Sequence, residues 1–120
     1  MARIVKKDTA EDRHHAERRG ALRLPCRLEA FCRPISGNQD LSWLGLVVNL
    51  SVAGLSLGCT RRFEPPTCLS VELESQTRNA PAKLLARVLY TRPMPAGPGW
   101  MIGCDFIQTL SQQELQELLA

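Results

Sequence analysis

Short segments in which apolar and polar residues alternate cover most of the chain, and this pattern constrains the fold more than any other feature. Period-two alternation puts every second side chain on one face, so each segment predicts a strand with one buried face. Turn-forming residues separate the segments, most clearly PISGN at 34–38 and PMPAGPG at 93–99. The six predicted strands are 24–33, 43–50, 55–59, 68–74, 82–91 and 100–107.

The alternation also predicts which side chains face the core. In the first strand the apolar phase comprises Leu24, Cys26, Leu28, Ala30 and Cys32. In the second strand it comprises Leu44, Leu46, Val48 and Leu50. In the fourth strand it comprises Leu69, Val71 and Leu73. We expect these side chains to line one continuous interior.

The C-terminal tail follows a helical pattern instead. Ser111 and Glu114 form a capping box, and Leu115, Leu118 and Leu119 follow at helical spacing. Six short strands with hairpin-length connections predict an antiparallel β-barrel or tightly curled sheet, closed by this one helix. The prediction is therefore a mainly β fold, with a flexible N-terminal arm at 1–16 and one barrel domain at 17–120.

Enzymatic patterns are missing from the sequence. There is no βαβ alternation and no glycine-rich phosphate loop, which disfavours a triphosphate or dinucleotide fold. His14 and His15 are the only histidines, and both lie in the polar arm, away from the strands. Asp105 has no acidic or histidine partner in the strand pattern. We therefore expect no catalytic residues and no enzymatic activity.

The cysteines and the hydropathy indicate a reducing compartment. Five cysteines are scattered without a CxxC pair, which disfavours both a zinc site and a disulfide framework. Three of them fall where an inward strand residue would lie, which suits small buried side chains. No apolar run is long enough to span a bilayer, and the N-terminus lacks a signal-peptide core. The expected location is the cytoplasm, without membrane insertion, metal or cofactor.

The net charge of +3 is concentrated at one end of the chain. Residues 1–23 carry seven basic and four acidic side chains, whereas residues 24–120 carry eight of each. A nucleic-acid-binding surface more often spreads basic residues over the folded body, with aromatic residues between them. This chain has only six aromatic residues, and none lies near the N-terminal arginines. A compact anion fits this charge distribution better than a nucleic acid.

Two short motifs stand out from the strand pattern. The stretch ERRGALR at 17–23 holds three arginines, and NLSVAGL at 49–55 begins at the end of the second strand. Asn49 and Ser51 are two residues apart, so we expect both side chains on the face opposite to Val48 and Leu50. Gly54 would permit a positive φ and a close backbone approach. Taken alone, the first motif fits a solvated boundary and the second fits an ordinary β-turn.

Taken together, the motifs resemble the signature of the PilZ domain family. That signature is RxxxR, often RRxxxR, followed after a spacer by (Asp/Asn)-x-Ser-x-x-Gly, and here 25 residues separate the two halves. The fixed positions are matched by Arg19, Arg23, Asn49, Ser51 and Gly54, with Arg18 completing the longer form. The six strands and the closing WMIGCDF at 100–106 also resemble the family, whose fold is a six-stranded split barrel with a C-terminal helix.

The resemblance implies a receptor for cyclic di-GMP, a bacterial second messenger. Guanidinium groups donate bidentate hydrogen bonds to phosphates and to the O6/N7 edge of guanine. Asn49 and Ser51 would contact a guanine, and Gly54 would keep the turn open for the base. Asn49 replaces the commoner aspartate, so its contact with guanine lacks charge assistance. The implied ligand-binding residues are Arg18, Arg19, Arg23, Asn49, Ser51 and Gly54.

A mechanism follows from the position of the arginines between arm and barrel. A ligand that bridges both would order the junction and alter a contact with a downstream protein. The doubled Arg18-Arg19 permits one or two ligand molecules, and the chain is expected to be a monomer or weak dimer. Two alternatives stay open: a PilZ-like adaptor that binds protein but no nucleotide, and a barrel that binds single-stranded nucleic acid.

Other cationic and aromatic residues have simpler interpretations. Arg61 and Arg62 could add a phosphate contact, but a solvated loop is the expected setting. Trp100 shares the phase of Ile102 and is expected to pack in the core, and the environment of Trp43 is left open.

Overall fold

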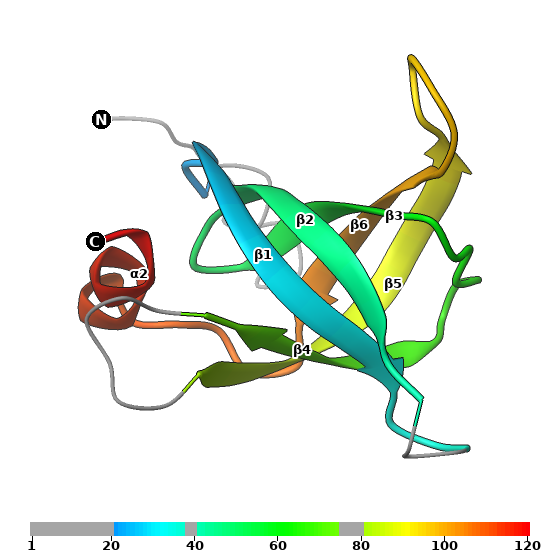
Figure 1. Cartoon of the computed structure of the whole chain (residues 1–120). Helices are drawn as coiled ribbons and strands as arrows, with labels where there is room; N and C mark the ends of the chain where they lie inside the picture. Colours follow the sequence, from blue (N-terminus) through cyan, green and yellow to red (C-terminus); the bar gives the residue numbers. More distant parts are fainter. Residues whose placement is uncertain (1–20, 38–40, 75–80) are drawn as a thin grey trace, which may run out of the picture.

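The computed structural model describes residues 21–37, 41–74 and 81–120, which form six strands and one helix (Figure 1). Each observed strand coincides with a predicted one to within two residues at either end. The helix follows the predicted capping box. The elements are β1 (Leu24–Pro34), β2 (Trp43–Leu50), β3 (Gly54–Cys59), β4 (Cys68–Leu73), β5 (Ala82–Pro93), β6 (Trp100–Phe106) and α2 (Gln112–Leu119).

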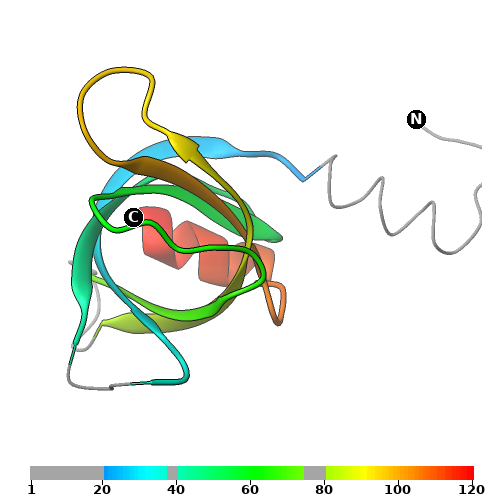
Figure 2. The same ribbon diagram turned by 90° about the vertical axis from the view of Figure 1, so that its right-hand side faces the viewer.

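The strands close into a barrel in the order β1-β2-β3-β6-β5-β4. Every neighbouring pair is antiparallel. Figure 2 looks approximately along the barrel and shows the ring of strands with α2 behind it. Closure pairs both edges of every strand, which removes the free edges of an open sheet. The predicted mainly β fold, a six-stranded antiparallel barrel with a C-terminal helix, is confirmed.

The interior is filled by alternate residues of the strands. In β1 and β4 the observed burial follows the predicted phase, because Ala30, Cys32 and the inward residues of β4 are inaccessible to solvent. Burial of these side chains is the main source of stability, at about 25 cal/mol for each Å² of apolar surface. The fully buried aliphatic residues include Val47, Leu50, Leu55, Leu57, Leu69, Val71, Leu73 and Ile102.

Separate segments close the two ends of the barrel. At one end lies α2, whose Leu115 and Leu118 belong to the buried core (Figure 2). The capping box is formed, since the Ser111 hydroxyl accepts from the Glu114 amide at 3.0 Å. At the other end the segment between β3 and β4 inserts Phe63, which is 2% exposed. Leu118 of α2 is only 4% exposed and faces the core.

Two β-bulges change the facing of residues along their strands. In β2 the register shifts between Val47 and Asn49, and in β5 it shifts between Val88 and Tyr90. An extra residue in one strand moves every later side chain to the opposite face. The predicted phase of β2 is therefore wrong for most of the strand. Gly45 and Val47 face the core, whereas Leu44 is 55% exposed, and only after the bulge does Leu50 face inward as expected.

Candidate functional site

The two motifs meet at the α2 end of the barrel. Arg23 directly precedes β1, Asn49 lies near the end of β2, and Ser56 lies in the adjacent β3. The Arg23 guanidinium donates hydrogen bonds to Asn49 Oδ1 at 2.9 Å and to Ser56 Oγ at 3.3 Å. Both acceptors are neutral, so neither of them cancels the positive charge of Arg23. The contact therefore places a positive charge, not balanced by either acceptor, where a residue of the first motif meets a residue of the second.

The bulge in β2 aims Asn49 at this point. Val47 faces the core, and in a regular strand Asn49 would also face inward. The extra residue Val48 reverses the facing, so Asn49 lies outside and Leu50 inside. Asn49 thus pairs with Ser56 across the sheet and presents its amide oxygen to Arg23.

Ser56 was not predicted as a site residue, although a signal for it exists. It occupies the polar position between Leu55 and Leu57, both fully buried in the barrel, and therefore points outward. Ser56 is nevertheless only 4% exposed. An outward polar residue on the strand that follows the second motif was the signal that could have identified it.

Ser51 does not share the outer surface with Asn49, so this part of the prediction is wrong. It is 1% exposed and its hydroxyl accepts from the amides of Ala53 and Gly54, both at 3.1 Å. The same hydroxyl donates to the Gly54 carbonyl at 3.3 Å. These bonds close a serine turn around residues 51–54. The side chain of Ser51 therefore shapes the turn that follows Asn49.

Gly54 does not adopt the positive φ that a glycine permits, but its backbone does approach a neighbouring strand closely. A Cβ at this position would lie 2.1 Å from the Cys104 carbonyl oxygen and 2.9 Å from the Asp105 Cα. The close backbone approach is thus made to β6. The glycine allows the serine turn to rest directly on the neighbouring strand, which holds Asn49 in place.

The other two predicted site residues, Arg18 and Arg19, lie outside the described residues. Leu22, one residue before Arg23, is 72% exposed. Leu22 therefore lies on the surface, next in sequence to the arginine that contacts Asn49.

Asp105 is tied into a structural ion pair. Although it lies on the outward phase of β6, it is only 5% exposed, and its Oδ2 accepts from Arg87 of β5 at 2.9 Å. The hydrogen bond to Asp105 raises the pKa of Arg87. The pair joins two adjacent strands, since Arg87 and Asp105 are direct cross-strand partners.

The arginines and tryptophans near the far end of the barrel pack on one another. The Arg61 guanidinium lies 4.4 Å from the centroid of Trp43, and the Arg62 guanidinium lies 4.8 Å from that of Trp100. Arg62 also forms an ion pair with Glu64. Trp100 is half-buried beneath Arg62, and Trp43 packs edge-on against Phe63. Cation–π stacking therefore explains the position of both guanidinium groups at this end of the barrel.

The cysteines are free thiols, and three of the five are buried. Burial raises the pKa of Cys32 and of Cys104 to about 12, so both stay protonated and unreactive at neutral pH. No group of three or more potential metal ligands occurs in the part of the chain that the structure describes.

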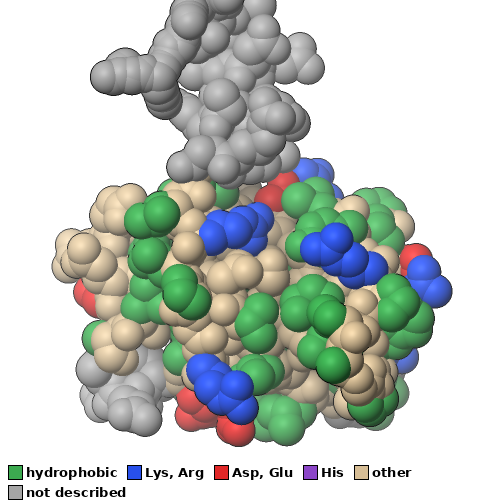
Figure 3. All heavy atoms as spheres, turned by 90° about the horizontal axis from the view of Figure 1, so that it is seen from above, with side chains coloured by type: hydrophobic (Ala, Val, Ile, Leu, Met, Phe, Trp, Pro, Cys, Tyr) green, Lys and Arg blue, Asp and Glu red, His purple; other side chains and the backbone are tan. Residues whose placement is uncertain are grey.

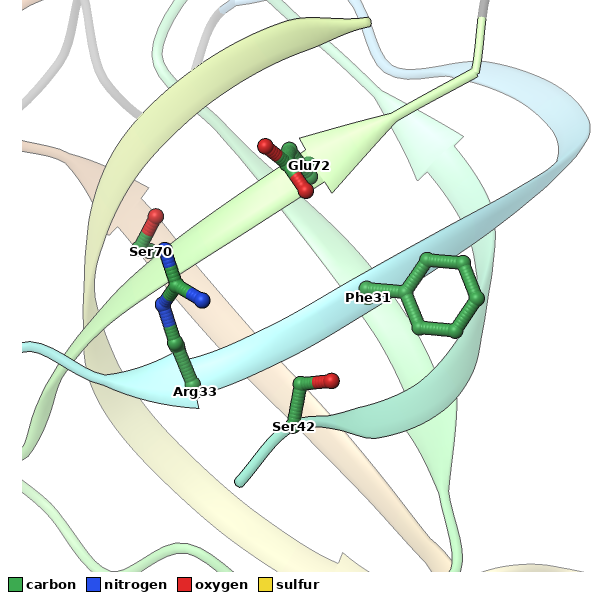
Figure 4. A pocket seen from close by; sticks show the side chains of 5 residues that line it. All are labelled: Phe31, Arg33, Ser42, Ser70 and Glu72. Carbon is green, nitrogen blue, oxygen red and sulfur yellow. The ribbon is translucent and has the colours of Figure 1, made fainter. Parts of the chain in front are cut away.

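Two hollows on the described surface lie away from the Arg23–Asn49 contact. One of about 70 Å³ opens between β1 and β4, with Phe31, Arg33, Ser42, Ser70 and Glu72 around it (Figure 4). This volume accommodates a few water molecules and no nucleobase. A second, of about 310 Å³, lies between β5, residues 107–110 and Glu114 of α2. Neither of these two hollows is lined by Arg23 or Asn49.

The charges on the visible surface are dispersed. Figure 3 shows Lys and Arg side chains lying apart from one another, between apolar and uncharged side chains. A continuous basic surface, which would suit a long polyanion, is not present on this face. No helix within the described ranges is both long and apolar enough to cross a membrane.

Comparisons with known proteins identify the family of the chain and the type of its fold. A family model of the PilZ domain matches residues 15–120, whereas no curated protein matches the chain. The inhibitor of motility MotI/DgrA of Bacillus subtilis has a similar structure, with a TM-score of 0.61 and 14% identity, covering 82% of this chain. The match covers 46% of that protein, so this chain spans less than half of its length.

A second similar structure is the PilZ domain of YcgR from Escherichia coli, solved with c-di-GMP. Its TM-score is 0.56, with 14% identity, and the match covers 82% of this chain and 86% of that one. At this level of identity, the two structural similarities show only that the fold is shared.

Proposed function

Because the chain belongs to the PilZ domain family, we propose that it is a receptor for cyclic di-GMP that acts as an adaptor in bacterial second-messenger signalling. The observation that carries the proposal is the 2.9 Å contact between Arg23 and Asn49. These residues are 26 positions apart and belong to different halves of the signature. Their contact on the outer surface supports the proposal, because it brings one residue from each half of the signature together.

The chemistry of that location suits the ligand. Cyclic di-GMP carries two phosphodiester charges and two guanines, and arginine donates bidentate hydrogen bonds to either. Arg18, Arg19 and Arg23 supply these donors in the proposal, and Asn49 Oδ1 accepts from guanine N1–H or N2–H. Ser51 and Gly54 contribute by holding the turn that places Asn49, as argued from their contacts. When the ligand binds, an anionic phosphate oxygen takes the place of a neutral hydrogen-bond acceptor of Arg23.

The output we propose is a change in a protein contact. A ligand held by both Arg23 on the barrel and Arg18-Arg19 before it would order the junction between the arm, residues 1–16, and the barrel domain, 17–120. The newly ordered surface then binds or releases a downstream protein. Hydrogen exchange at residues 3–23, with and without ligand, tests this step, and unchanged protection would contradict it.

Titration calorimetry at fixed salt tests the binding. We expect cyclic di-GMP to bind the wild-type protein with micromolar or tighter Kd, and the stoichiometry to distinguish one ligand from two. Loss of one bidentate contact in Arg23→Ala or Arg19→Ala costs about 1–3 kcal/mol, which weakens binding roughly 5- to 150-fold.

Arg61→Ala is the matched control, because it removes the same charge at the opposite end of the barrel and should leave Kd unchanged. Absence of heat with folded wild-type protein would refute the receptor and favour a PilZ-like adaptor that binds protein without nucleotide. Equal weakening by all three substitutions would show that only net charge matters, as in nonspecific anion binding.

A further inference from the structure

Pairing along one edge of β5 is incomplete near the start of the strand. Every strand of the barrel has two neighbours, but β5 first pairs with β6 at Ala86, the partner of Phe106. On its other edge β5 already pairs with β4 from Ala82 onward. Residues 82–85 therefore have a strand on one edge only and extend past the end of β6 on the other.

The backbone of Lys83 points to this uncovered edge. The Leu85 carbonyl accepts from the Ile107 amide at 3.0 Å, so the backbone polar groups of Leu85 are directed to the β6 side. These groups alternate between the two edges of an antiparallel strand, and Lys83, two residues earlier, directs its N–H and C=O to the same side. Among the described residues, none forms a backbone hydrogen bond with Lys83 on that side. One residue thus offers a donor and an acceptor to an added strand.

A hollow of about 310 Å³ lies along this edge. It is lined by Lys83, Leu84 and Leu85 on one side and by residues 107–110 and Glu114 on the other. Figure 1 shows the start of β5 and α2 on the same side of the barrel. Successive side chains of a strand project to opposite faces, so a hollow that touches three successive residues lies at the edge of the strand. Its volume is at the lower end of the range for ligand pockets, about 300–1,000 Å³, and can receive part of a peptide.

Two large apolar side chains are exposed at this hollow. Ile107 is 56% exposed and Leu85 is 47% exposed, and the hydrogen bond between their backbones makes them neighbours. Lys83 lies on the same face as Leu85, and its ammonium, 3.8 Å from Glu72, belongs to a side chain that is 54% exposed. A segment that covers Leu85 and Ile107 removes apolar surface from water. An acidic residue in that segment would form a favourable cross-strand pair with Lys83.

The wall of the hollow is hydrogen-bonded to the second motif. The Leu110 amide donates to the Val52 carbonyl at 2.9 Å, and the Phe106 amide donates to the Ala53 carbonyl at 2.8 Å. Both acceptors lie in the serine turn of that motif. The segment 107–110 therefore connects the turn of the proposed nucleotide site with the open edge of β5. This continuity favours the downstream protein of the adaptor as the occupant of the hollow.

We propose that the downstream protein docks by adding a short extended segment to the open edge of β5. The segment pairs with the N–H and C=O of Lys83 and continues in the line of β6. It places an apolar side chain against Leu85 and Ile107 and an acidic one opposite Lys83. At about 3.4 Å per residue, the edge from Ala82 to Leu84 accommodates about three residues of an added strand. The identity of the partner rests on the proposed function, whereas the pairing itself needs no nucleotide.

Peptide selection against the full chain tests this docking mode. The probe is a phage-displayed library of random linear heptapeptides, selected without nucleotide, and the best binder is titrated into isotope-labelled protein and followed by NMR. We expect it to shift the amide resonances of Lys83, Leu85 and Ile107 and to slow hydrogen exchange at the Lys83 amide. Methylating a peptide nitrogen that faces β5 removes one hydrogen bond and should weaken binding about tenfold. Methylating the next nitrogen, which faces away, should have little effect.

Lys83→Pro removes the same hydrogen bond from the side of the protein. The Lys83 amide faces away from β4, and proline is found in strands at such edge positions, so the pairing with β4 is kept. We expect peptide binding to weaken about tenfold or more. Lys83→Gln is the matched control, because it keeps the amide and removes an exposed charge, which should weaken binding at most about fivefold. Melting curves show whether each variant folds, and if Lys83→Pro does not, the methylated peptides decide the case with unchanged protein.

The outcomes separate this inference from the other occupants and from the proposed function. If no peptide is selected, or if the best binder binds Lys83→Pro as tightly as wild type, edge pairing is refuted. Exchange protection of Lys83 in the isolated protein would also refute the partner, indicating a second copy if it grows with protein concentration and a segment of this chain if it does not. If the protein binds peptide but not cyclic di-GMP, the receptor fails and the docking edge stands. If it binds cyclic di-GMP but no peptide, the receptor stands and the docking edge fails.

Discussion

Replacing Gly54 by alanine tests whether the glycine of the second motif is required for packing. In the structure a Cβ at Gly54 would lie 2.1 Å from the Cys104 carbonyl oxygen, whereas real Cβ atoms essentially never approach another atom within 3.0 Å. β3 and β6 would therefore have to separate by about 0.9 Å at this point. The backbone of the closed barrel fixes the position of the Cβ and of the carbonyl oxygen, so a side-chain rotation cannot relieve the clash.

The cost follows from what such a separation disturbs. Overpacking in a well-packed interior costs about 1–3 kcal/mol. The hydrogen bond from the Phe106 amide to the Ala53 carbonyl, 2.8 Å long, lies beside the clash, and weakening it adds about 0.5–1.5 kcal/mol. We therefore expect Gly54→Ala to lower the free energy of unfolding by about 3 kcal/mol. For a domain of this size that lowers Tm by roughly 12 °C.

Gly58→Ala is the matched control, because it makes the same change in the same strand. A Cβ at Gly58 meets only the Met94 side chain, with the methyl carbon at 3.4 Å. Its stability should stay within about 0.5 kcal/mol of wild type or rise slightly, since alanine restricts the unfolded chain. Urea unfolding followed by circular dichroism measures both. Equal stabilities of the two variants would refute the packing argument.

Three further predictions concern the site and the core. Ser51→Ala should lower the free energy of unfolding by about 1–3 kcal/mol in urea unfolding, because two turn amides, one buried and one part-buried, lose their acceptor; an unchanged midpoint would contradict it. Asn49→Asp should tighten cyclic di-GMP binding several-fold in calorimetry, since one carboxylate can accept from both Arg23 and guanine with charge assistance; weaker binding would contradict it. Cys32 and Cys104, whose thiol pKa values are about 12, should resist Ellman's reagent in the native protein at pH 8 and react after unfolding.

Local patterns in the sequence were sufficient for the elements of the fold. Alternation in β1 and β4 predicted their inward residues correctly, because a strand buried on one face must repeat every two residues. The capping box at Ser111 likewise predicted where α2 begins, because its hydrogen bonds are local. The order of the two motifs pointed to the family before any geometry was known.

The details of the candidate site depended on longer-range contacts. The bulges at Val48 and Leu89 reverse the facing of Asn49 and Tyr90, and neither bulge has a local sequence signal such as a strand glycine or proline. Whether Ser51 faces solvent or a turn depends on hydrogen bonds to amides two and three residues ahead. A prediction from alternation alone assumes that the strand stays regular. It therefore placed Ser51 on the wrong face.

Local patterns were thus sufficient to identify which segments are strands, which residues form the core of β1 and β4, and which two motifs match the family signature. Only the folded barrel shows that Arg23 reaches Asn49 and Ser56, and that Gly54 packs on Cys104. It also shows that the bulge in β5 turns Tyr90 to the outer surface. The physical reason is barrel closure. Register between strands distant in sequence is set by the fit of the whole ring, and a single extra residue then redirects every side chain beyond it.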